Sequence, residues 1–429
     1  MSLERPKLFE TRKSFFLFIG FLFLLLLSRL WFEYRVYQDF VSKPFYYLHA
    51  NVLSAYTKHK GRHSYQVLKL RGDGGMVFYT TTHKLQELSG RYLRLQLFPN
   101  QSISFWGFLG TFYVKSRIKE IADSPNTLKQ TLYEKVASQH EDPMLQAFYN
   151  AIFFAASVPK ELREKISILG VSHLVALSGF HLGILWGLVY GLLLFLYRPL
   201  QQRYFPYRFS LIDMGLLTVL ILGLYVWFVD APPSLVRSYA MLLTGWSMLL
   251  MGIELLSFTF LATVIALLLV FFPSLLVSWG FWFSVAGVFY IFLLLHYTKQ
   301  WNKWVLTLLV IPVGIFLLML PVVHAVFPVT STYQLLSPLL SLLFVPFYPL
   351  VMLLHLVGMG DIFDRGLQWL FSLPHSSVEH ILSVWMLGIY MVLSVAAVFY
   401  KKLFYILFGL SVVYSIYLFA EPLYRPMTM

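Results

Sequence analysis

The densest group of reactive side chains in an apolar stretch lies between Gly170 and Gly183, which reads Gly-Val-Ser-His-Leu-Val-Ala-Leu-Ser-Gly-Phe-His-Leu-Gly. An ionisable residue at membrane depth is a functional candidate, because a charge there is costly without a partner. On a continuous helix, His173 and His181 would share one face. The Ser178-Gly pair between them can break that helix, which frees backbone N–H and C=O groups that only protein or water can satisfy. A polar, partly unwound helix within a bundle is typical of a transport path.

Three interpretations of this segment compete. In the first, the two histidines and Ser178 line a polar path. In the second, His173 and His181 only form hydrogen bonds between helices. The third is an intramembrane serine hydrolase, in which Ser178 is the nucleophile and His324 or His355 is the base. That chemistry needs a base within hydrogen-bond reach of the serine oxygen and an oxyanion hole, and nothing in the sequence marks either distant histidine for the task.

No metal centre or cofactor site is expected. The sequence has no His-x-His-x-Asp-His and no His-Glu-x-x-His pattern, and the pair Glu379-His380 stands alone. The chain contains no cysteine, which excludes disulfides, cysteine-ligated zinc, iron–sulfur clusters and thiol catalysis. It also lacks a Gly-x-x-x-x-Gly-Lys nucleotide-binding loop, so energy for transport would come from a partner or a gradient. We therefore expect a protein that is not an enzyme.

A second polar cluster, Asp230-Ala-Pro-Pro-Ser-Leu-Val-Arg237, falls between two apolar runs. Its two consecutive prolines end one helix and start the next, which puts Arg237 about one turn inside the membrane. An arginine at that depth needs a partner or water. Either Asp230 pairs with Arg237 as a structural clamp, or the guanidinium lines a passage for phosphates, whose oxygens match its planar fork.

The composition defines the elements that must position these clusters. Of the 429 residues, 58% are hydrophobic and only 12% are charged, whereas a soluble domain carries about a quarter charged residues. The apolar residues form runs of about 20, the length needed to cross about 30 Å of hydrocarbon. A soluble enzyme, a disordered protein and a single-span anchor are therefore excluded, and we expect a polytopic α-helical membrane protein.

About ten membrane spans are expected from these runs. The first is an uncleaved anchor at 14–32, which follows a basic cytoplasmic segment at 1–13. The remaining spans fall in a multispan domain at 170–421. They are 171–197, 209–229, 233–252, 257–274, 278–297, 304–326, 334–357, 378–399 and 402–420.

The basic loops test this topology, because cytoplasmic loops carry an excess of Lys and Arg. With the N-terminus in the cytoplasm, the basic residues that fall inside are Arg198, Arg203, Arg208, Lys299 and Lys303. Lys401 and Lys402 then fall outside, against the rule. We therefore expect one element between 334 and 376 to be re-entrant or absent.

Residues 44–121 have a different texture, with alternating β-branched and aromatic segments separated by turns that contain glycine. Five short strands of this kind predict a small extracytoplasmic β-barrel of the OB type. The expected strands are Tyr46–Tyr56, Ser64–Arg71, Gly75–Thr81, Arg91–Leu97 and Ile103–Val114.

A connector at 122–168 follows the predicted barrel. Asp123-Ser124-Pro125 is a helix start signal, and Pro143 and Pro159 are interruptions. We expect one or two amphipathic helices that lie along the membrane surface or brace the barrel.

The β domain is basic, in a chain whose net charge is +13. Two explanations compete: positive-inside bias with attraction to anionic lipid, or a polyanionic substrate. Basic side chains beside flat rings suit a single nucleic acid strand, since charge follows the phosphates while rings stack on the bases. Alternatively, the rings form the barrel core and the charges only solvate it. The residues expected to contact DNA are Lys58, Lys60, Arg62, Lys69, Arg71, Arg91, Arg94 and Trp106.

The segment at 170–183 closely resembles Gly-Leu-Ser-His-Leu-Leu-Ala-Ile-Ser-Gly-Leu-His-Val-Gly, the signature of the ComEC family, the inner-membrane DNA channel of natural competence. Pro233-Ser-Leu-Val-Arg237 resembles that family's Pro-Ser-Val-Leu-Arg, and Leu336-Ser-Pro-Leu339 resembles its later Leu-Ser-Pro-Leu. The run Pro273-Ser-Leu-Leu-Val-Ser-Trp-Gly-Phe-Trp-Phe-Ser284 is similar to its Asp-Pro and Pro-Gly-Phe-Gln-Leu-Ser-Phe segment. The motifs occur in the family's order.

The chain also departs from this pattern. Phe272 stands where the family usually has aspartate, and Trp282 stands where it often has glutamine, so polar contacts are not expected at these positions. Many family members end in a metallo-β-lactamase-like nuclease domain with a His-x-His-x-Asp-His motif, for which this chain has neither the motif nor the length. The resemblance thus implies a short form without built-in strand degradation.

The resemblance implies a channel that moves single-stranded DNA inward across the bacterial inner membrane during transformation. The implied partners are the DNA strand, membrane lipid, a cytosolic helicase-like ATPase and an outer DNA receptor, and a homo-oligomer is allowed for. The serine hydrolase and a transporter of another polyanion, such as a lipid-linked glycan, stay open as alternatives. The residues expected to line the path are His173, Ser178, His181, Ser234, Arg237 and Ser284.

Overall fold

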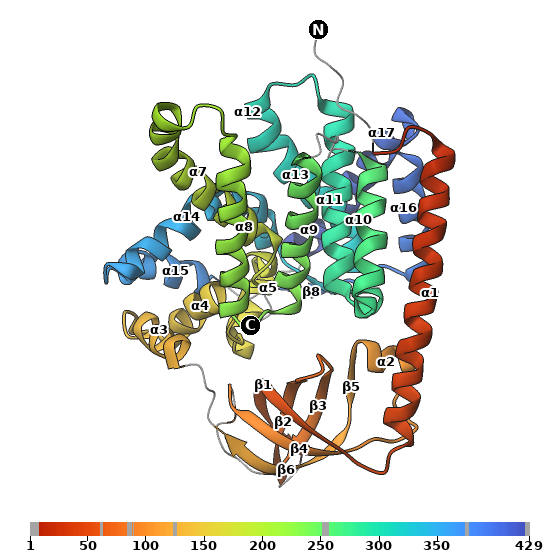
Figure 1. The fold of residues 1–429 in the computed structure, drawn as a ribbon, viewed down its shortest axis with the longest axis vertical. Helices are drawn as coiled ribbons and strands as arrows, with labels where there is room; N and C mark the ends of the chain where they lie inside the picture. Colours follow the sequence, from red (N-terminus) through yellow and green to blue (C-terminus); the bar gives the residue numbers. More distant parts are fainter. Residues whose placement is uncertain are drawn as a thin grey trace. The chain divides into compact units, whose positions relative to one another are not determined.

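The computed structural model of the chain describes residues 8–60, 63–83, 88, 90–122, 127–250, 257–373 and 377–424 (Figure 1). The chain divides into two compact units. Unit 1 comprises Met1–Leu8, Leu132–Leu261 and Trp282–Met429, and unit 2 comprises Phe9–Thr131 and Ala262–Phe281. Unit 1 is mostly helical, whereas unit 2 combines the N-terminal helix with a small sheet.

Helix α1 (Arg12–Ser42) opens unit 2. Thr11 caps its first turn, because the threonine hydroxyl accepts a hydrogen bond from the backbone N–H of Ser14 at 3.1 Å. The helix ends just before Lys43-Pro44, since a proline disfavours helical backbone in the residue that precedes it. Its 31 residues extend for about 46 Å, well beyond the roughly 30 Å of a hydrocarbon core.

A six-stranded sheet follows α1 in the order β5-β3-β2-β1-β4-β6. The strands are β1 (Tyr46–Lys60), β2 (His63–Gly72), β3 (Val77–Thr82), β4 (Tyr92–Phe98), β5 (Thr111–Tyr113) and β6 (Lys115–Ala122). The first four expected strands are therefore confirmed within a few residues. Strand alternation gives the sheet one apolar face, whose fully buried residues include Leu68, Leu70, Phe78, Leu93 and Leu95.

The expected fifth strand, Ile103–Val114, is wrong. Ser104 caps a short helix, α2 (Phe105–Leu109), and β5 and β6 follow it. The helix forms because its aromatic residues pack on α1, with the Phe108 and Phe40 rings 5.4 Å apart. β5 pairs with β3 and β6 pairs with β4, so the sheet curves back on itself. The described pairs establish a curved six-stranded sheet, and the closed five-stranded barrel is not established.

Seven helical segments in the described ranges are long and apolar enough to cross a membrane. Besides α1 they are α7 (Gly179–Tyr204), α8 (Ser210–Phe228), α11 (Trp279–Thr298), Lys303–His324 with α12 (Lys303–Val305) and α13 (Ile311–His324), Thr332–Leu356 with α14 (Ser337–Leu356), and Lys401–Ala420 within α17 (Lys401–Tyr424). Two apolar helices are shorter, α10 (Phe258–Phe271) and α16 (Val384–Ala396). The chain is thus a mostly helical membrane protein, and the helices of the described ranges do not confirm the expected count of about ten spans.

The connector forms three helices, α3 (Thr127–Ala137), α4 (Pro143–Phe154) and α5 (Lys160–Ile168). The expected start signal at 123–125 lies outside the described residues. Pro143 is the first residue of α4, and the Asp142 carboxylate accepts a hydrogen bond from the Met144 N–H at 2.8 Å. Most of α4 is buried in the main core of unit 1. Helix α4 is therefore part of the protein core, and the expected position of the connector along the membrane surface stays a prediction.

The segment between α13 and α16 starts and ends at the same place in unit 1. Strand β7 (Val329–Thr330) precedes α14 and pairs with β8 (Val378–Glu379). The Leu382 N–H also donates a hydrogen bond to the His324 carbonyl at 3.0 Å. In between lie α14, η4 (Gly360–Phe363) and α15 (Asp364–Phe371), which we call the α14–α15 hairpin. This hairpin therefore ends beside its own beginning, and the re-entrant element expected in this part of the chain stays a prediction.

The ends of α11 and α16 bring four lysines to one end of unit 1. The Tyr297 hydroxyl, near the end of α11, donates a hydrogen bond to the Ala397 carbonyl just after α16 at 2.7 Å. The ends of α11 and α16 therefore lie together, away from the β7–β8 pair. The lysines that follow these two helices are Lys299, Lys303, Lys401 and Lys402. They therefore gather at one end of unit 1, and the side of the membrane on which Lys401 and Lys402 lie stays a prediction.

Candidate functional site

The histidine-containing segment is broken as its sequence predicts. Helix α6 (Ser172–Val175) ends before Ala176, and α7 starts at Gly179. Ser178 caps α7, because its hydroxyl accepts a hydrogen bond from the Phe180 N–H at 3.3 Å. The serine has extended backbone angles, which stops the helix on its N-terminal side. His173 and His181 consequently lie on two different helices.

Helix α9 (Pro233–Leu250) contacts the break. The Ser234 hydroxyl donates a hydrogen bond to the Leu177 carbonyl at 2.8 Å, which satisfies a backbone group that the break frees. Gly179 lets the two helices approach, since a Cβ atom there would lie 3.1 Å from the Ser238 hydroxyl. The two motifs singled out in the sequence therefore meet in the structure.

Helix α14 faces both histidines with one of its sides. His173 Nε2 lies 3.1 Å from the Ser341 hydroxyl. Because that hydroxyl donates its own proton to the Ser337 carbonyl at 2.7 Å, it accepts the histidine N–H. The His181 ring packs edge-on against Phe344 and Tyr348, with centroids 5.2 and 4.9 Å away.

His181 is fully enclosed in this conformation. Its exposed fraction is 0%, its Nδ1 lies 3.4 Å from the Ser178 hydroxyl, and its Nε2 has no hydrogen-bond partner in the described part of the chain. A buried ring nitrogen without a partner is costly. The ring therefore packs among aromatic side chains here, and its place in an open path remains a prediction.

Two further residues expected along the path lie on different helices. Arg237 is on α9, one turn after Ser234, and is only 8% exposed. Ser284 is half-buried on α11, whose neighbouring Ala286 and Tyr290 belong to a separate core with α13, α16 and α17. The structure thus brings His173, Ser178, His181 and Ser234 together around the break, with Arg237 on the adjoining helix, and places Ser284 in another cluster.

The two distant histidines give the hydrolase alternative no support. His324 hydrogen-bonds to the Leu320 carbonyl and the Thr330 hydroxyl, each at 3.0 Å. His355 contacts His140 and the Val351 carbonyl. The two histidines proposed as bases are thus engaged with groups other than Ser178.

The sheet of unit 2 carries its basic residues on the face opposite the apolar core. Lys69 and Arg71 alternate with the buried Leu68 and Leu70 on β2, and Arg94 alternates with buried leucines on β4. Strand β1 lies between β2 and β4. The register pairs Asn51 with Arg71 on one side and His49 with Arg94 on the other. Lys69, Arg71 and Arg94 therefore share one surface, which we call the cationic face.

Aromatic rings interleave with these cations. The Lys69 ammonium lies over the Tyr79 ring, 5.7 Å from its centroid, on the neighbouring strand. The His49 and Tyr92 rings are parallel, with centroids 5.7 Å apart. The Tyr92 hydroxyl donates to the Asp73 carboxylate at 2.7 Å, and this hydrogen bond raises the pKa of Tyr92. Rings beside cations are what a single strand of nucleic acid requires.

The other residues expected to contact DNA have separate positions. Lys58 is exposed beside Tyr56 near the end of β1, and Arg91 is exposed just before β4. Trp106 is 57% exposed on α2, a helix that is not part of the sheet but packs on α1 and, through Phe108, on Phe112 of β5. The side chain of Lys60 and the whole of Arg62 lie outside the described residues.

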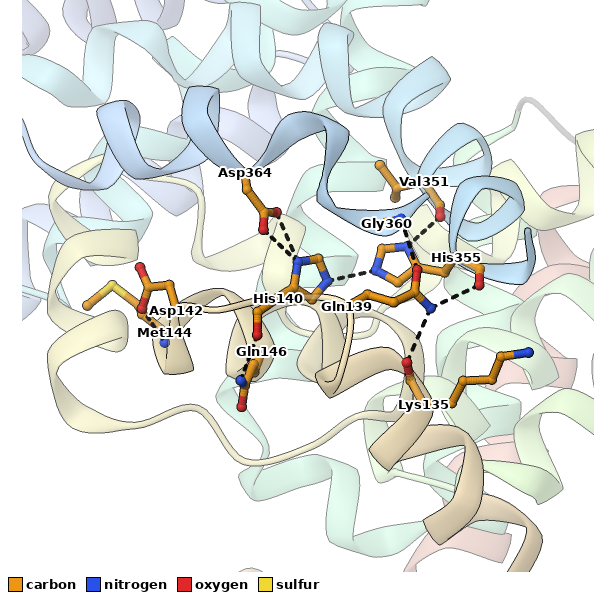
Figure 2. Close-up of polar contacts among 10 residues, drawn as sticks. All are labelled: Lys135, Gln139, His140, Asp142, Met144, Gln146, Val351, His355, Gly360 and Asp364. Carbon is orange, nitrogen blue, oxygen red and sulfur yellow. Dashed lines mark hydrogen bonds and ion pairs between the residues drawn. The ribbon is translucent and has the colours of Figure 1, made fainter. Parts of the chain in front are cut away.

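One polar cluster was not anticipated. His140 precedes α4, His355 lies near the end of α14, and Asp364 starts α15, and their side chains form a chain of hydrogen bonds (Figure 2). From the sequence, His355 is a candidate only as a base for Ser178, because its actual partner, His140, lies more than 200 positions away along the chain. Helical periodicity carries no signal for such a contact. In the described ranges, no group of three or more histidine or acidic residues is placed to hold a metal ion.

Comparison with known proteins identifies relatives of the helical region. A family model described as Competence protein matches residues 154–422, more than half of the chain. The chain is 28% identical to the uncharacterized protein YcaI of Escherichia coli (strain K12) over 231 residues, which cover 50% of this chain and 29% of that protein. It is 26% identical to an uncharacterized protein of Aquifex aeolicus (strain VF5) over 290 residues, covering 66% and 62% respectively. The chain spans less than two thirds of the length of these relatives, and no solved structure matches it.

Proposed function

The chain belongs to the Competence protein family, the ComEC-like family whose motifs it carries, and we propose that it conducts single-stranded DNA across the cytoplasmic membrane of a bacterium. Membership of this family supports a role in competence and DNA uptake, and the long apolar helices support a membrane protein. The family match begins at residue 154 and so leaves out the sheet of unit 2. DNA capture by the sheet therefore has to be argued from the sheet's own geometry.

The cationic face is the observation that carries the proposal. Residues two apart on one strand are about 7 Å apart, and adjacent strands are about 4.8 Å apart. Lys69, Arg71 and Arg94 therefore present closely spaced positive charges on one surface, with Tyr79 and Tyr92 among them. Charges in such a row follow a phosphate backbone, while the rings stack on unpaired bases. We propose that this face captures the strand.

The broken helix supplies the membrane part of the proposed path. Ser178, Ser234 and His173 place polar groups among apolar helices, and α9 brings the buried Arg237 close to them. Arginine matches phosphate oxygens better than other cations because its fork is planar. His181 is enclosed by Phe344 and Tyr348, so we assign the present conformation to a closed path. Opening then requires α14 to move relative to α7.

The positive-inside rule orients the helical unit. Lys299, Lys303, Lys401 and Lys402 lie at one end of unit 1. We place this end in the cytoplasm. The β7–β8 pair and the α14–α15 hairpin then belong to the outer side, and α14 enters the membrane and returns. The location is the inner membrane of a bacterium.

The partners follow from what the sequence lacks. With no Gly-x-x-x-x-Gly-Lys loop in the chain, we propose that a cytosolic helicase-like ATPase draws the strand inward and that an outer receptor delivers it. A homo-oligomer is compatible with this scheme. The path residues act by binding and guiding phosphate, and we assign none of them to catalysis.

The test measures binding of a fluorescent single-stranded oligonucleotide to the full chain in detergent at several salt concentrations. Simultaneous Lys69→Ala, Arg71→Ala and Arg94→Ala substitutions are expected to weaken binding and to lower the log–log salt slope by about 2, since each phosphate contact to a single strand contributes about 0.7. The matched control removes three exposed cations of unit 1, Lys160, Arg163 and Arg365.

Two outcomes contradict the proposal. In the first, the sheet variant binds as tightly and with the same salt slope as the wild type. In the second, the control variant loses as much affinity as the sheet variant, which shows attraction by net charge alone. Absence of oligonucleotide binding at low salt, together with binding of a lipid-linked glycan, would favour the other polyanion.

A further inference from the structure

The side chains of His140, His355 and Asp364 form one continuous hydrogen-bonded chain (Figure 2). His140 Nδ1 lies 2.8 Å from the nearer Asp364 carboxylate oxygen. His140 Nε2 lies 2.9 Å from His355 Nε2, and His355 Nδ1 lies 2.6 Å from the Val351 carbonyl. This series of hydrogen bonds therefore runs from the Asp364 carboxyl group through two imidazoles to a backbone oxygen.

Counting protons shows what this arrangement requires. The Val351 carbonyl can only accept, so His355 Nδ1 must carry a hydrogen. The His140–His355 contact joins two ring nitrogens and needs one hydrogen, and the His140–Asp364 contact needs another. Three hydrogens are thus needed, whereas two neutral histidines and an ionised carboxylate supply only two. The third is a bound proton, whether it resides on a histidine or on the carboxyl group.

The surroundings favour retention of that proton. His140 and His355 are 4% and 5% exposed, and the Asp364 side chain is 15% exposed. The Tyr149 ring stacks on His140 at 4.3 Å. Burial raises the pKa of Asp364, against the opposing effect of its hydrogen bond to His140. An uncompensated negative charge is costly here, and the bound proton makes the three side chains neutral as a group.

Hydrogen bonds from two glutamine side chains also hold the backbone around these three residues. The Gln139 amide donates to the carbonyls of Lys135 and His355 at 3.2 and 3.1 Å, and its oxygen accepts the Gly360 N–H at 2.9 Å. The Gln146 amide donates to the His140 carbonyl at 2.8 Å. The other titratable or charged side chains on α3, α4, α14, η4, α15 and the α3–α4 segment are Lys129, Tyr133, Glu134, Lys135, Glu141, Asp142, Tyr149, Tyr348, Asp361 and Arg365. Asp142 is engaged as the cap of α4.

We propose that His140, His355 and Asp364 form a proton-binding site that fastens the connector to the α14–α15 hairpin. One face of the site comes from the segment between α3 and α4, and the other comes from the end of α14 and the start of α15. Loss of the proton leaves two hydrogen-bond acceptors facing each other at one contact, so the fastening weakens as pH rises. The inference stands independently of DNA transport, since it rests on these contacts alone.

The site also bears on the position of α14. That helix holds the proton site near its C-terminal end and faces His173 and His181 through Ser341, Phe344 and Tyr348. Release of the proton frees the end of the helix whose movement the proposed path requires. The ligand of this site is a proton, and its coupling partner is α14 itself.

The test exploits an isosteric substitution. In the Asp364→Asn variant, the amide N–H donates to His140 Nδ1, and all three contacts are then made without a bound proton. The measurement is the detergent-unfolding equilibrium of the purified chain across pH. Above about pH 6.5, histidines in the unfolded chain have lost their protons, whereas the folded site still holds one. The folding equilibrium constant of the wild type should therefore fall by up to about tenfold per pH unit until the site itself is deprotonated.

The Asp364→Asn variant should keep wild-type stability at low pH and lose that part of the pH dependence. Asp361→Asn removes an exposed carboxylate three residues away and is expected to keep the wild-type profile. Asp364→Ala should be less stable than both at every pH. The proposal is overturned if Asp364→Asn retains the wild-type pH dependence, or if it is as unstable at low pH as Asp364→Ala.

Discussion

The sheet of unit 2 and the core of unit 1 use similar side chains in opposite ways. On the cationic face, Arg94 lies 4.0 Å from Glu120 with both side chains more than half exposed, a geometry that contributes little to stability. In unit 1, His140 and Asp364 are joined at 2.8 Å with the histidine side chain fully enclosed. Exposed charges remain available for a ligand and respond to salt, whereas enclosed groups depend on one another and respond to protons.

Ligand attraction and fold stability depend on different charged groups in this protein, although a single net charge counts both. Net charge predicts attraction to a polyanion, and it comes from exposed cations that fold stability hardly needs. The buried polar groups determine which helices touch, and their removal should change the fold's stability more than its ligand affinity. The predictions below run from the largest expected effect to the smallest.

Thiol labelling from one side of the membrane gives the largest contrast, because the expected result is all or none. The chain has no cysteine, so single substitutions report without background. Glu379→Cys on β8 should react with a membrane-impermeant reagent added outside intact cells, and Lys402→Cys should react only after the cytoplasm is opened. Labelling of the Lys402→Cys variant from outside would reverse the proposed orientation.

A methyl group at Gly360 should damage the buried region more than any single change on the sheet. A Cβ atom there would lie 2.6 Å from His355 Nε2 and 2.7 Å from the Gln139 oxygen. Gly360→Ala is expected to lower the unfolding free energy by about 2–4 kcal/mol, from overpacking and a broken hydrogen bond. Gly366→Ala is the control, since its Cβ meets nothing within 4 Å, and it should raise helix stability by up to about 1 kcal/mol. Equal effects in the two unfolding curves would contradict the packing described for His355.

The cap of α7 predicts a smaller loss. Ser178→Ala removes the acceptor for the Phe180 N–H and is expected to cost about 1 kcal/mol in unfolding free energy. Ser178→Asp should restore the cap and DNA uptake, because an aspartate caps a helix as well as serine does. A hydrolase that uses the serine oxygen as nucleophile would be inactive in both variants. Uptake that fails in both variants while stability is restored in the second would therefore favour hydrolase chemistry.

Local patterns were sufficient for the surface but not for the interior. Alternation along β2 and β4 correctly puts Lys69, Arg71 and Arg94 opposite a leucine core, since side-chain direction in a strand is fixed by sequence period. The Ser178-Gly break was also predictable, because cap chemistry is local. Trp106 shows where local patterns fail. It lies on α2, whose contacts with α1 cannot be read from the alternation of residues along a strand.

The interior required tertiary structure. His140, His355 and Asp364 come from three segments that meet only after α4 is buried, and none carries a recognisable spacing. The same holds for Lys401 and Lys402, whose place at the same end of unit 1 as Lys299 depends on the β7–β8 pair and on the Tyr297 hydrogen bond. Periodicity describes one element at a time, and these features exist only between elements.

Entry of labelled single-stranded DNA into the cytoplasm of competent cells tests the central claim most directly. The measurement compares wild type, a deletion of the gene, the triple alanine variant of the cationic face and Arg237→Ala, each confirmed to be present in the membrane. The account predicts no cytoplasmic label in the deletion strain, reduced label in the triple variant and reduced label in Arg237→Ala. Cytoplasmic uptake in the deletion strain equal to that of the wild type would contradict it.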